Sequence, residues 1–428
     1  KLTIVRRGVD DQLYFTVKRD KIPILSLDAS YMIQPKTGYI RINRFGATTA
    51  EEFAEALKSL QKKGMKDLIL DLQGNGGGYL NAAIDLANEF LKQKELIVYT
   101  EGRAARRSDF FAKGTGNFKN GRLIILVDEY SASASEIVTG AIQDWDRGVV
   151  VGRRTFGKGL VQRPIDLPDG SMIRLTIARY YTPSGRCIQK PYDSTANLDG
   201  RLTGENSQDK YNQELIDRFN HGEMIHADSI HFADSLKAQT KRMGRTVYGG
   251  GGIMPDIFVP QDTIGMTSYF RMADRQGLTI RFAFDYTDRN RSALKEYDTA
   301  EKLESYLKTQ NLLNTFANWA EKKGLKRRNN QIQQSKKLFE ISLYGNIIYN
   351  MLGLESYIEY LNQTDQTVQK ALEVLEEGKS FPVAPEQPVT AKKEKHDQGK
   401  EKTTAQIDQP KEKAVSGPAT YEVVFQLA

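Results

Sequence analysis

The chain has 428 residues, of which 39% are hydrophobic and 27% are charged, and its formal net charge is +7. That length is enough for about two or three domains and for at least one large hydrophobic core. Because both signs of charge are mixed along most of the chain, the basic excess indicates ordinary solubility, and we expect no nucleic-acid partner. The single cysteine, Cys187, excludes an internal disulfide and a zinc site built from cysteines. No apolar run approaches the roughly 20 residues of a membrane span, and the sequence starts at Lys1, so a signal peptide or anchor upstream stays open.

The first residues have the pattern of two short strands. Residues 2–6 and 13–18 are strand-like and flank a turn at 8–11. Two strands cannot form a stable unit alone. We therefore expect residues 1–20 to be the end of a domain whose beginning lies upstream.

Residues 37–151 alternate between strand and helix patterns. Strands are expected at 38–42, 67–72, 123–127 and 148–151, and helices at 50–62, 81–91 and 135–143. The strand at 67–72 is almost continuously apolar, which is typical of a sheet covered on both faces. Strand, helix and strand in series predict an α/β fold with crossover connections. A hairpin follows, with strands at 159–165 and 172–180.

The character of the chain changes beyond about residue 266. Residues 299–323 and 334–378 have a helical period, so we expect a helical domain at 266–378. Residues 379–418 are rich in Pro, Lys, Glu, Gln and Thr, which predicts a disordered linker. Residues 419–428 contain a strand-like run, which we expect to be part of a further module of unknown kind.

A glycine-rich segment at residues 74–78 follows the apolar strand. Such a loop often binds phosphate, but no Lys-Ser or Lys-Thr pair follows Gly78, so a P-loop is disfavoured. Glycines also let a backbone approach another element closely. The loop can therefore aim N–H groups at one point near the end of the strand.

A serine and a lysine stand out because the first 220 residues contain no histidine. Ser133 and Lys158 lie 25 positions apart (158 minus 133), which leaves room for a helix, a strand and a turn between them. A serine hydroxyl needs a base to become a nucleophile. Without an imidazole nearby, lysine is the natural base for acyl chemistry in this region.

The surroundings of both residues suit such chemistry. An exposed lysine has a pKa of about 10.4, but burial lowers the pKa of a lysine by up to about 3–5 units. Phe156 precedes Lys158, and Leu160 follows it. Gln162 is expected on the same strand face as Lys158, where its neutral amide could orient the amine. Ser133 lies just before the predicted helix, beside backbone N–H groups that can stabilise an oxyanion.

Each of these segments alone is more often structural than functional. The serine run at 131–135 is typical of tight packing or a helix cap, and a Gly-Lys-Gly segment is typical of a turn. Histidines spaced by five residues do not share a helix face, so they indicate surface residues; they are His221, His226 and His231. We expect no metal site and no cofactor.

Taken together, five blocks of the sequence resemble the carboxy-terminal processing proteases, the S41 serine peptidases. The blocks are residues 70–78, 131–137, 155–162, 180–186 and 249–256. The serine and lysine blocks at this spacing are highly specific. The resemblance covers about residues 1–262 and implies a ClpP/crotonase-like α/β peptidase core, with residues 21–265 as that core.

The resemblance implies a role for each candidate residue. Ser133 would be the nucleophile, Lys158 the general base and Gln162 the residue that positions the lysine. The oxyanion hole would be formed by the backbone N–H groups of Ala134 and of a glycine, with Gly78 the best match and Gly77 the near alternative. Members usually carry a PDZ domain before the core, and residues 1–20 resemble its carboxy-terminal end.

Two positions depart from the family pattern. Gln73 stands where many members have arginine, and Gly76 where many have proline. Neither position has a chemical role in the scheme above. The departures therefore bear on the local shape of the loop rather than on the activity.

The resemblance also implies a substrate class and a location. We expect a serine endopeptidase that cleaves near the C-termini of exported or envelope proteins through an acyl-enzyme, in the periplasm or cell envelope. Its partners would be protein or peptide substrates, bound through their C-termini. An adaptor protein, membrane association through a segment upstream of the chain, and a homo-oligomer stay open.

Two other functions compete with this interpretation. One is a non-catalytic S41-like protein that binds peptides or other ligands, against which the intact pair of Ser133 and Lys158 argues. The other is a crotonase-type acyl-CoA enzyme on the same fold, which would need acidic catalytic partners and would leave the Ser–Lys pair idle.

Overall fold

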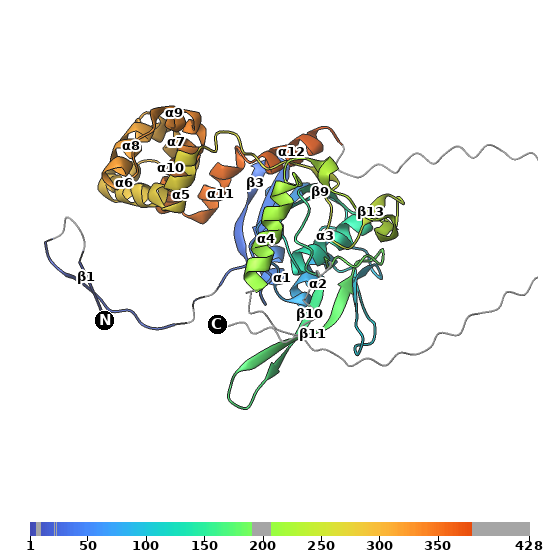
Figure 1. Cartoon of the computed structure of the whole chain (residues 1–428). Coiled ribbons are helices and arrows are strands. Elements are labelled where there is room, and N and C mark those ends of the chain that lie inside the picture. The colour runs from blue at the N-terminus through green and yellow to red at the C-terminus, as the bar shows by residue number, and fades with distance from the viewer. Residues whose placement is uncertain (6–9, 21, 23, 191–206, 379–428) are drawn as a thin grey trace, which may run out of the picture.

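The computed structural model describes residues 1–5, 10–20, 22, 24–190 and 207–378 (Figure 1). Its strands are β1 (Leu2–Ile4), β2 (Leu13–Phe15), β3 (Leu27–Gln34), β4 (Thr37–Ile42), β5 (Asp67–Asp71), β6 (Leu96–Glu101), β7 (Ser108–Phe111), β8 (Arg122–Val127), β9 (Val149–Gly152), β10 (Leu160–Asp166), β11 (Met172–Tyr181), β12 (Lys237–Gln239), β13 (Thr246–Tyr248) and β14 (Ile257–Phe258). Its α-helices are α1 (Thr49–Lys62), α2 (Leu80–Asn88), α3 (Ala134–Asp144), α4 (Ser207–Asn220), α5 (Ser268–Arg275), α6 (Leu278–Leu294), α7 (Ala300–Lys308), α8 (Leu312–Lys322), α9 (Asn329–Gln334), α10 (Lys336–Leu352), α11 (Leu354–Asn362) and α12 (Gln366–Glu376).

A six-stranded sheet forms the centre of the molecule, in the order β14-β9-β8-β5-β4-β3. All neighbouring pairs are parallel except β3 and β4, which are antiparallel. The strands expected at 38–42, 67–72, 123–127 and 148–151 correspond to β4, β5, β8 and β9. The predicted α/β fold with crossover connections is confirmed.

Both faces of this sheet are covered, as the apolar pattern of β5 predicts. Leu68 and Leu70 of β5 belong to the core that α1, α2 and α3 close. Ile69, which points to the opposite face, shares a second core with Val368 and Val374 of α12. Figure 1 shows α12 lying against the sheet, close to β9 and β3. Helices from the end of the described chain therefore complete the packing of strands some 300 residues earlier.

The helices from α5 to α10 surround a hydrophobic core of their own. Aromatic rings dominate it, with Phe282 edge-on to Phe316 at 5.5 Å and Phe316 tilted against Phe339 at 5.2 Å. The periodicity of the sequence predicts α7, α8 and α10 of this group but not α5, α6 and α9. The division of the chain at residue 266 stays a prediction, and the segments 379–418 and 419–428 lie outside the described residues.

A second, antiparallel sheet has the order β10-β11-β6-β7. Its β10 is an edge strand that begins two residues after Lys158 and pairs with β11 in a long hairpin. In Figure 1 the far end of this hairpin projects from the α/β body. The hairpin expected from the sequence is confirmed, and it starts at the candidate base.

Among the residues that the structure describes, no helix combines the length and the apolar character that a membrane span requires. At the start of the chain, β1 and β2 pair as an antiparallel hairpin. Its assignment to a PDZ domain stays a prediction.

Candidate active site

Ser133 occupies the N-cap position of α3, in a strained backbone conformation. Its φ is 56° and its ψ is −110°, and it is half-buried, whereas every residue of α3 is buried. A residue other than glycine in this region costs about 1–3 kcal/mol and persists only where the surroundings impose it. The strained turn places the Ser133 hydroxyl at the exposed end of a buried helix.

The glycine loop lies directly against this serine. A Cβ atom added to Gly77 would lie 2.7 Å from the Cβ of Ser133 and 2.9 Å from the backbone nitrogen of Ala134, and the φ of Gly77 is 98°. A Cβ atom on Gly78 would lie 2.1 Å from the carbonyl oxygen of Phe45. Only glycine fits at either position. The structure thus brings together three of the residues expected at the site.

Asn75 holds the glycine loop in place. Its side-chain Oδ1 accepts a hydrogen bond from the N–H of Gly77 at 2.8 Å, and its Nδ2 donates to the carbonyl of Ile42 at 2.8 Å. Its own carbonyl accepts from the N–H of Ala132 at 2.9 Å and from the hydroxyl of Ser135 at 2.9 Å. Asn75 is fully buried, so it links the loop rigidly to the segment that carries Ser133.

Two N–H groups near Ser133 stand apart from this network. The N–H of Gly77 is already bound to Asn75. Within residues 24–190 and 207–378, no protein acceptor is recorded for the N–H of Gly78 or for that of Ala134. Gly78 and Ala134 therefore fit the role of hydrogen-bond donors to a ligand better than Gly77 does.

The segment that carries Lys158 is tied to the serine segment by one buried carboxylate. Glu136, in the first turn of α3, accepts hydrogen bonds from the N–H of Ser133 at 2.8 Å and from the N–H of Lys158 at 2.8 Å. It also accepts from the hydroxyl of Thr155 at 2.6 Å and from the N–H of Gly157 at 2.7 Å. The two segments are held side by side through this one side chain.

Further contacts hold the backbone around Lys158. The hydroxyl of Tyr180 donates to the carbonyl of Lys158. The side chain of Gln189 accepts from the N–H of Gly159 at 2.8 Å, and the N–H of Lys190 donates to the carbonyl of Gly157 at 3.0 Å. The lysine segment is therefore fixed by β11 and by the residues that follow it.

The side chains of the expected catalytic residues are less closely joined than their backbones. Lys158 is half-buried, and no hydrogen bond between its amine and the hydroxyl of Ser133 is recorded in the described part of the chain. Gln162 is exposed on the edge strand β10, beside a register shift that falls between Val161 and Gln162. Catalytic hydrogen bonds are often long before substrate binds. The expected role of Gln162 stays a prediction.

Burial is the main influence on the pKa values of Glu136 and Tyr180. It raises the pKa of Glu136, and the hydrogen bonds from Thr155, Gly157, Lys158 and Ser133 oppose that rise. Burial also raises the pKa of Tyr180 well above its usual value, and the charge of Glu136 adds to this effect while a hydrogen bond with Ser133 opposes it. Tyr180 is thus a neutral hydroxyl that lies near the serine.

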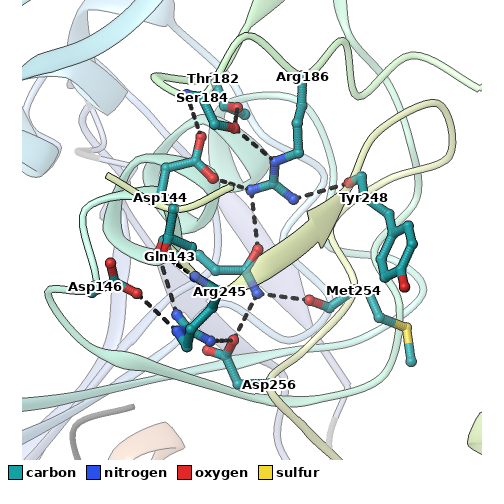
Figure 2. A network of polar contacts seen from close by, with 11 residues as sticks. Gln143, Asp144, Asp146, Thr182, Ser184, Arg186, Arg245, Tyr248, Met254 and Asp256 are labelled. Atoms are coloured by element: carbon teal, nitrogen blue, oxygen red, sulfur yellow. Dashed lines mark hydrogen bonds and ion pairs between the residues drawn. The ribbon is translucent and has the colours of Figure 1, made fainter. Parts of the chain in front are cut away.

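The other end of α3 is anchored by a polar network (Figure 2). Arg186 donates to Asp144, and both side chains are fully buried. Arg245 pairs with Asp146 at 2.8 Å and with Asp256 at 2.6 Å. Arg186 and Asp256, from the blocks at 180–186 and 249–256, therefore hold this end of the helix in place, whereas Tyr180 of the first block lies near the serine.

Sequence reasoning assigned no role to Asn75, Glu136 or Tyr180. Glu136 carried a signal, because a glutamate three residues after a serine is the pattern of a capping box. Asn75 and Tyr180 carried none beyond their places in the family blocks. The histidines at 221, 226 and 231 lie outside this site, and within the described ranges no group of His, Cys, Asp or Glu is placed to hold a metal ion.

Comparison with known proteins agrees with the geometry. Residues 36–195 match the model of peptidase family S41, and residues 269–353 match a family of unknown function. A carboxyl-terminal-processing protease of Synechocystis sp. is 40% identical over 193 residues, which are 44% of this chain and 44% of that protein. A carboxy-terminal processing protease of Bacillus subtilis is 37% identical over 191 residues, which are 44% of this chain and 40% of that protein.

A solved structure titled photosystem II D1 C-terminal processing protease is 32% identical, with a TM-score of 0.35, over 42% of this chain and 49% of that one. The chain spans about half, or less, of the curated relatives it matches. The region that matches the family model, residues 36–195, contains the serine, lysine and glycine segments described above. Over residues 36–195 this chain is therefore similar to peptidase family S41.

Proposed function

We propose that this chain is a serine endopeptidase in which Ser133 is the nucleophile and Lys158 the general base. The observation that carries the proposal is the contact of the glycine loop with the serine segment, which sets two unpaired N–H groups beside a strained serine at a helix N-terminus. Donors fixed beside a nucleophile are the main requirement for stabilising the oxyanion of acyl transfer. The identity of 37–40% with processing proteases supports the same reaction.

The reaction would proceed through an acyl-enzyme. The neutral amine of Lys158 takes the proton from the hydroxyl of Ser133, whose oxygen attacks the carbonyl carbon of the peptide bond. The N–H groups of Gly78 and Ala134 bind the oxyanion. The ammonium of Lys158 then gives its proton to the leaving amine as the C–N bond breaks. A water molecule, deprotonated by Lys158, attacks the ester, and the hydroxyl of Ser133 regains a proton as the acid leaves.

The substrates are proposed to be exported or envelope proteins cut near their C-termini. Similarity supports the cleavage near C-termini, since the relatives are C-terminal processing proteases of two bacteria and a chloroplastic C-terminal processing peptidase. The action on C-termini is thus a proposal by similarity.

A non-catalytic peptide-binding protein is the second candidate. Two observations favour it: Gln162 is exposed, and the amine of Lys158 is not hydrogen-bonded to the hydroxyl of Ser133 in the described structure. Such a protein would bind peptides at the same loop without cutting them.

Hydrolysis of casein by purified variants separates the two candidates. We expect Ser133→Ala and Lys158→Ala each to lower the rate by at least about 10³-fold while circular dichroism stays unchanged. The matched control is Ser171→Ala, because that exposed hydroxyl donates to Asp169 in the turn between β10 and β11 and should not be needed for chemistry. Near-normal activity of Lys158→Ala would show that the dyad is wrong, and no hydrolysis by the unmodified protein would favour the binding protein.

The substrate class needs a second experiment. A denatured pool of envelope proteins is incubated with the unmodified protein or with Ser133→Ala, and the new termini are identified by mass spectrometry. Cleavage sites that cluster near C-termini support the proposal. Sites spread evenly along the substrates would overturn the expected preference.

A further inference from the structure

We propose that Glu136 is a positioning residue whose carboxylate sets the separation of the nucleophile and the base. The proposal rests on the proposed roles of Ser133 and Lys158. Glu136 need not touch the substrate for this role. It would act by holding the two backbones from which the reacting side chains extend.

The strongest support is that a single oxygen atom bridges the two reacting residues. Oε2 of Glu136 accepts from the N–H of Ser133 and from the N–H of Lys158, each at 2.8 Å. The two backbone nitrogens therefore lie no more than 5.6 Å apart, which is twice that distance. No other side chain in the described ranges accepts hydrogen bonds from both residues. The pair would lose its fixed spacing if this oxygen were removed.

The second oxygen secures the same segment at two more points. Oε1 accepts from the hydroxyl of Thr155 at 2.6 Å and from the N–H of Gly157 at 2.7 Å. Thr155 is itself held, since its hydroxyl accepts from the N–H of Ile253 at 2.6 Å. The carboxylate thus restrains the turn before Lys158 as well as Lys158 itself.

The chemistry of this contact requires a carboxylate rather than an amide. An ionised carboxylate has only acceptor sites, about four in all, and Glu136 meets four donors. In Glu136→Gln, one oxygen becomes an NH₂ group that faces two donors. In Glu136→Asp, all acceptor sites remain but the side chain is shorter by one CH₂ group. The two variants therefore separate the loss of acceptors from a change in reach.

Steady-state hydrolysis of one peptide substrate tests this role. For Glu136→Gln we expect kcat to fall about 10²-fold with KM changed by less than about twofold, because a misplacement of about 1 Å costs rate and not binding. Glu136→Asp should recover part of the loss. The matched control is Glu129→Gln, another buried glutamate nearby, whose carboxylate pairs with Arg153 at 2.7 Å and does not bind the Ser133 or Lys158 backbone. It should keep kcat within about threefold.

A second measurement does not depend on activity. Amide hydrogen exchange should become faster at Ser133, Gly157 and Lys158 in Glu136→Gln, with the core strand β8 still protected. Normal exchange at these amides, or a kcat of Glu136→Gln close to that of the unmodified protein, would overturn the proposal. Equal losses in Glu129→Gln would also overturn it. Failure of the proposed dyad is distinguishable from failure of the role of Glu136. If the dyad is wrong, Ser133→Ala leaves hydrolysis unchanged, and the exchange experiment still reports on the contacts of Glu136.

Discussion

Replacing Gly77 by alanine is the sharpest test of the contact between the glycine loop and the serine. The added Cβ would lie 2.7 Å from the carbonyl oxygen of Ala132 and 2.7 Å from the Cβ of Ser133, distances that folded proteins do not tolerate. The φ of 98° adds a strain of about 1–2 kcal/mol for any residue with a Cβ. Because the obstructing atoms are backbone or sit on the strained turn, the loop must move away from the serine.

The movement would carry the N–H of Gly78 away from the oxyanion. Loss of one such donor lowers kcat by about 10²–10³-fold, or about 2.7–4 kcal/mol of transition-state stabilisation. We therefore expect Gly77→Ala to lose at least about 10²-fold in kcat for peptide hydrolysis. Thermal denaturation should show a loss of stability of at least about 1–2 kcal/mol, because the close contacts add to the backbone strain.

Gly76→Ala is the control for this experiment. No atom lies within 4 Å of a Cβ built on Gly76, and its φ is not positive. This variant should keep kcat within about threefold. If Gly77→Ala is folded and as active as Gly76→Ala, the glycine loop does not supply the oxyanion donor and the assignment of Gly78 fails.

Two further predictions concern stability. Arg186→Ala leaves the fully buried Asp144 without its ion-pair partner, so the free energy of unfolding in urea should fall by about 3–5 kcal/mol. The kcat per folded molecule should stay within about twofold, because Asp144 lies about 16 Å along α3 from Ser133. A large loss of kcat would contradict this separation. Burial raises the pKa of Glu136 above its usual 4.5, so the folded state binds this proton more tightly than the unfolded state does. Relative to Glu136→Gln, the unmodified protein should therefore lose stability as pH rises from about 4 through the raised pKa, and a difference that is the same at pH 4 and pH 8 would refute the sign.

The sequence pattern was most informative where a strand or helix has a strong apolar period. The continuous apolar run of β5 predicted a sheet covered on both faces, and the structure confirms it. The pattern could not say which helix covers the second face. A buried strand shows that apolar cover is needed, but α12 meets that need from some 300 residues away, and only packing selects it.

The candidate site divides in the same way. The placement of Ser133 at a helix start and of Gly77 and Gly78 after a buried strand followed from local patterns and from the family blocks. The roles of Asn75 and Glu136 did not follow from those patterns, although both residues lie within the family blocks. Their function depends on donors brought to them by other elements, and no local propensity describes such contacts.

The sequence by itself determined β4, β5, β8 and β9 with the helices α1, α2 and α3 between them, the similarity of residues 36–195 to peptidase family S41, and a serine and a lysine in a region without histidine. The tertiary structure decided that the N–H groups of Ser133 and Lys158 meet on one oxygen of Glu136, and that Gly77 touches Ser133. The reason is physical. A hydrogen bond requires two groups to meet within about 3 Å, and for residues on separate elements that distance is set by how the elements pack.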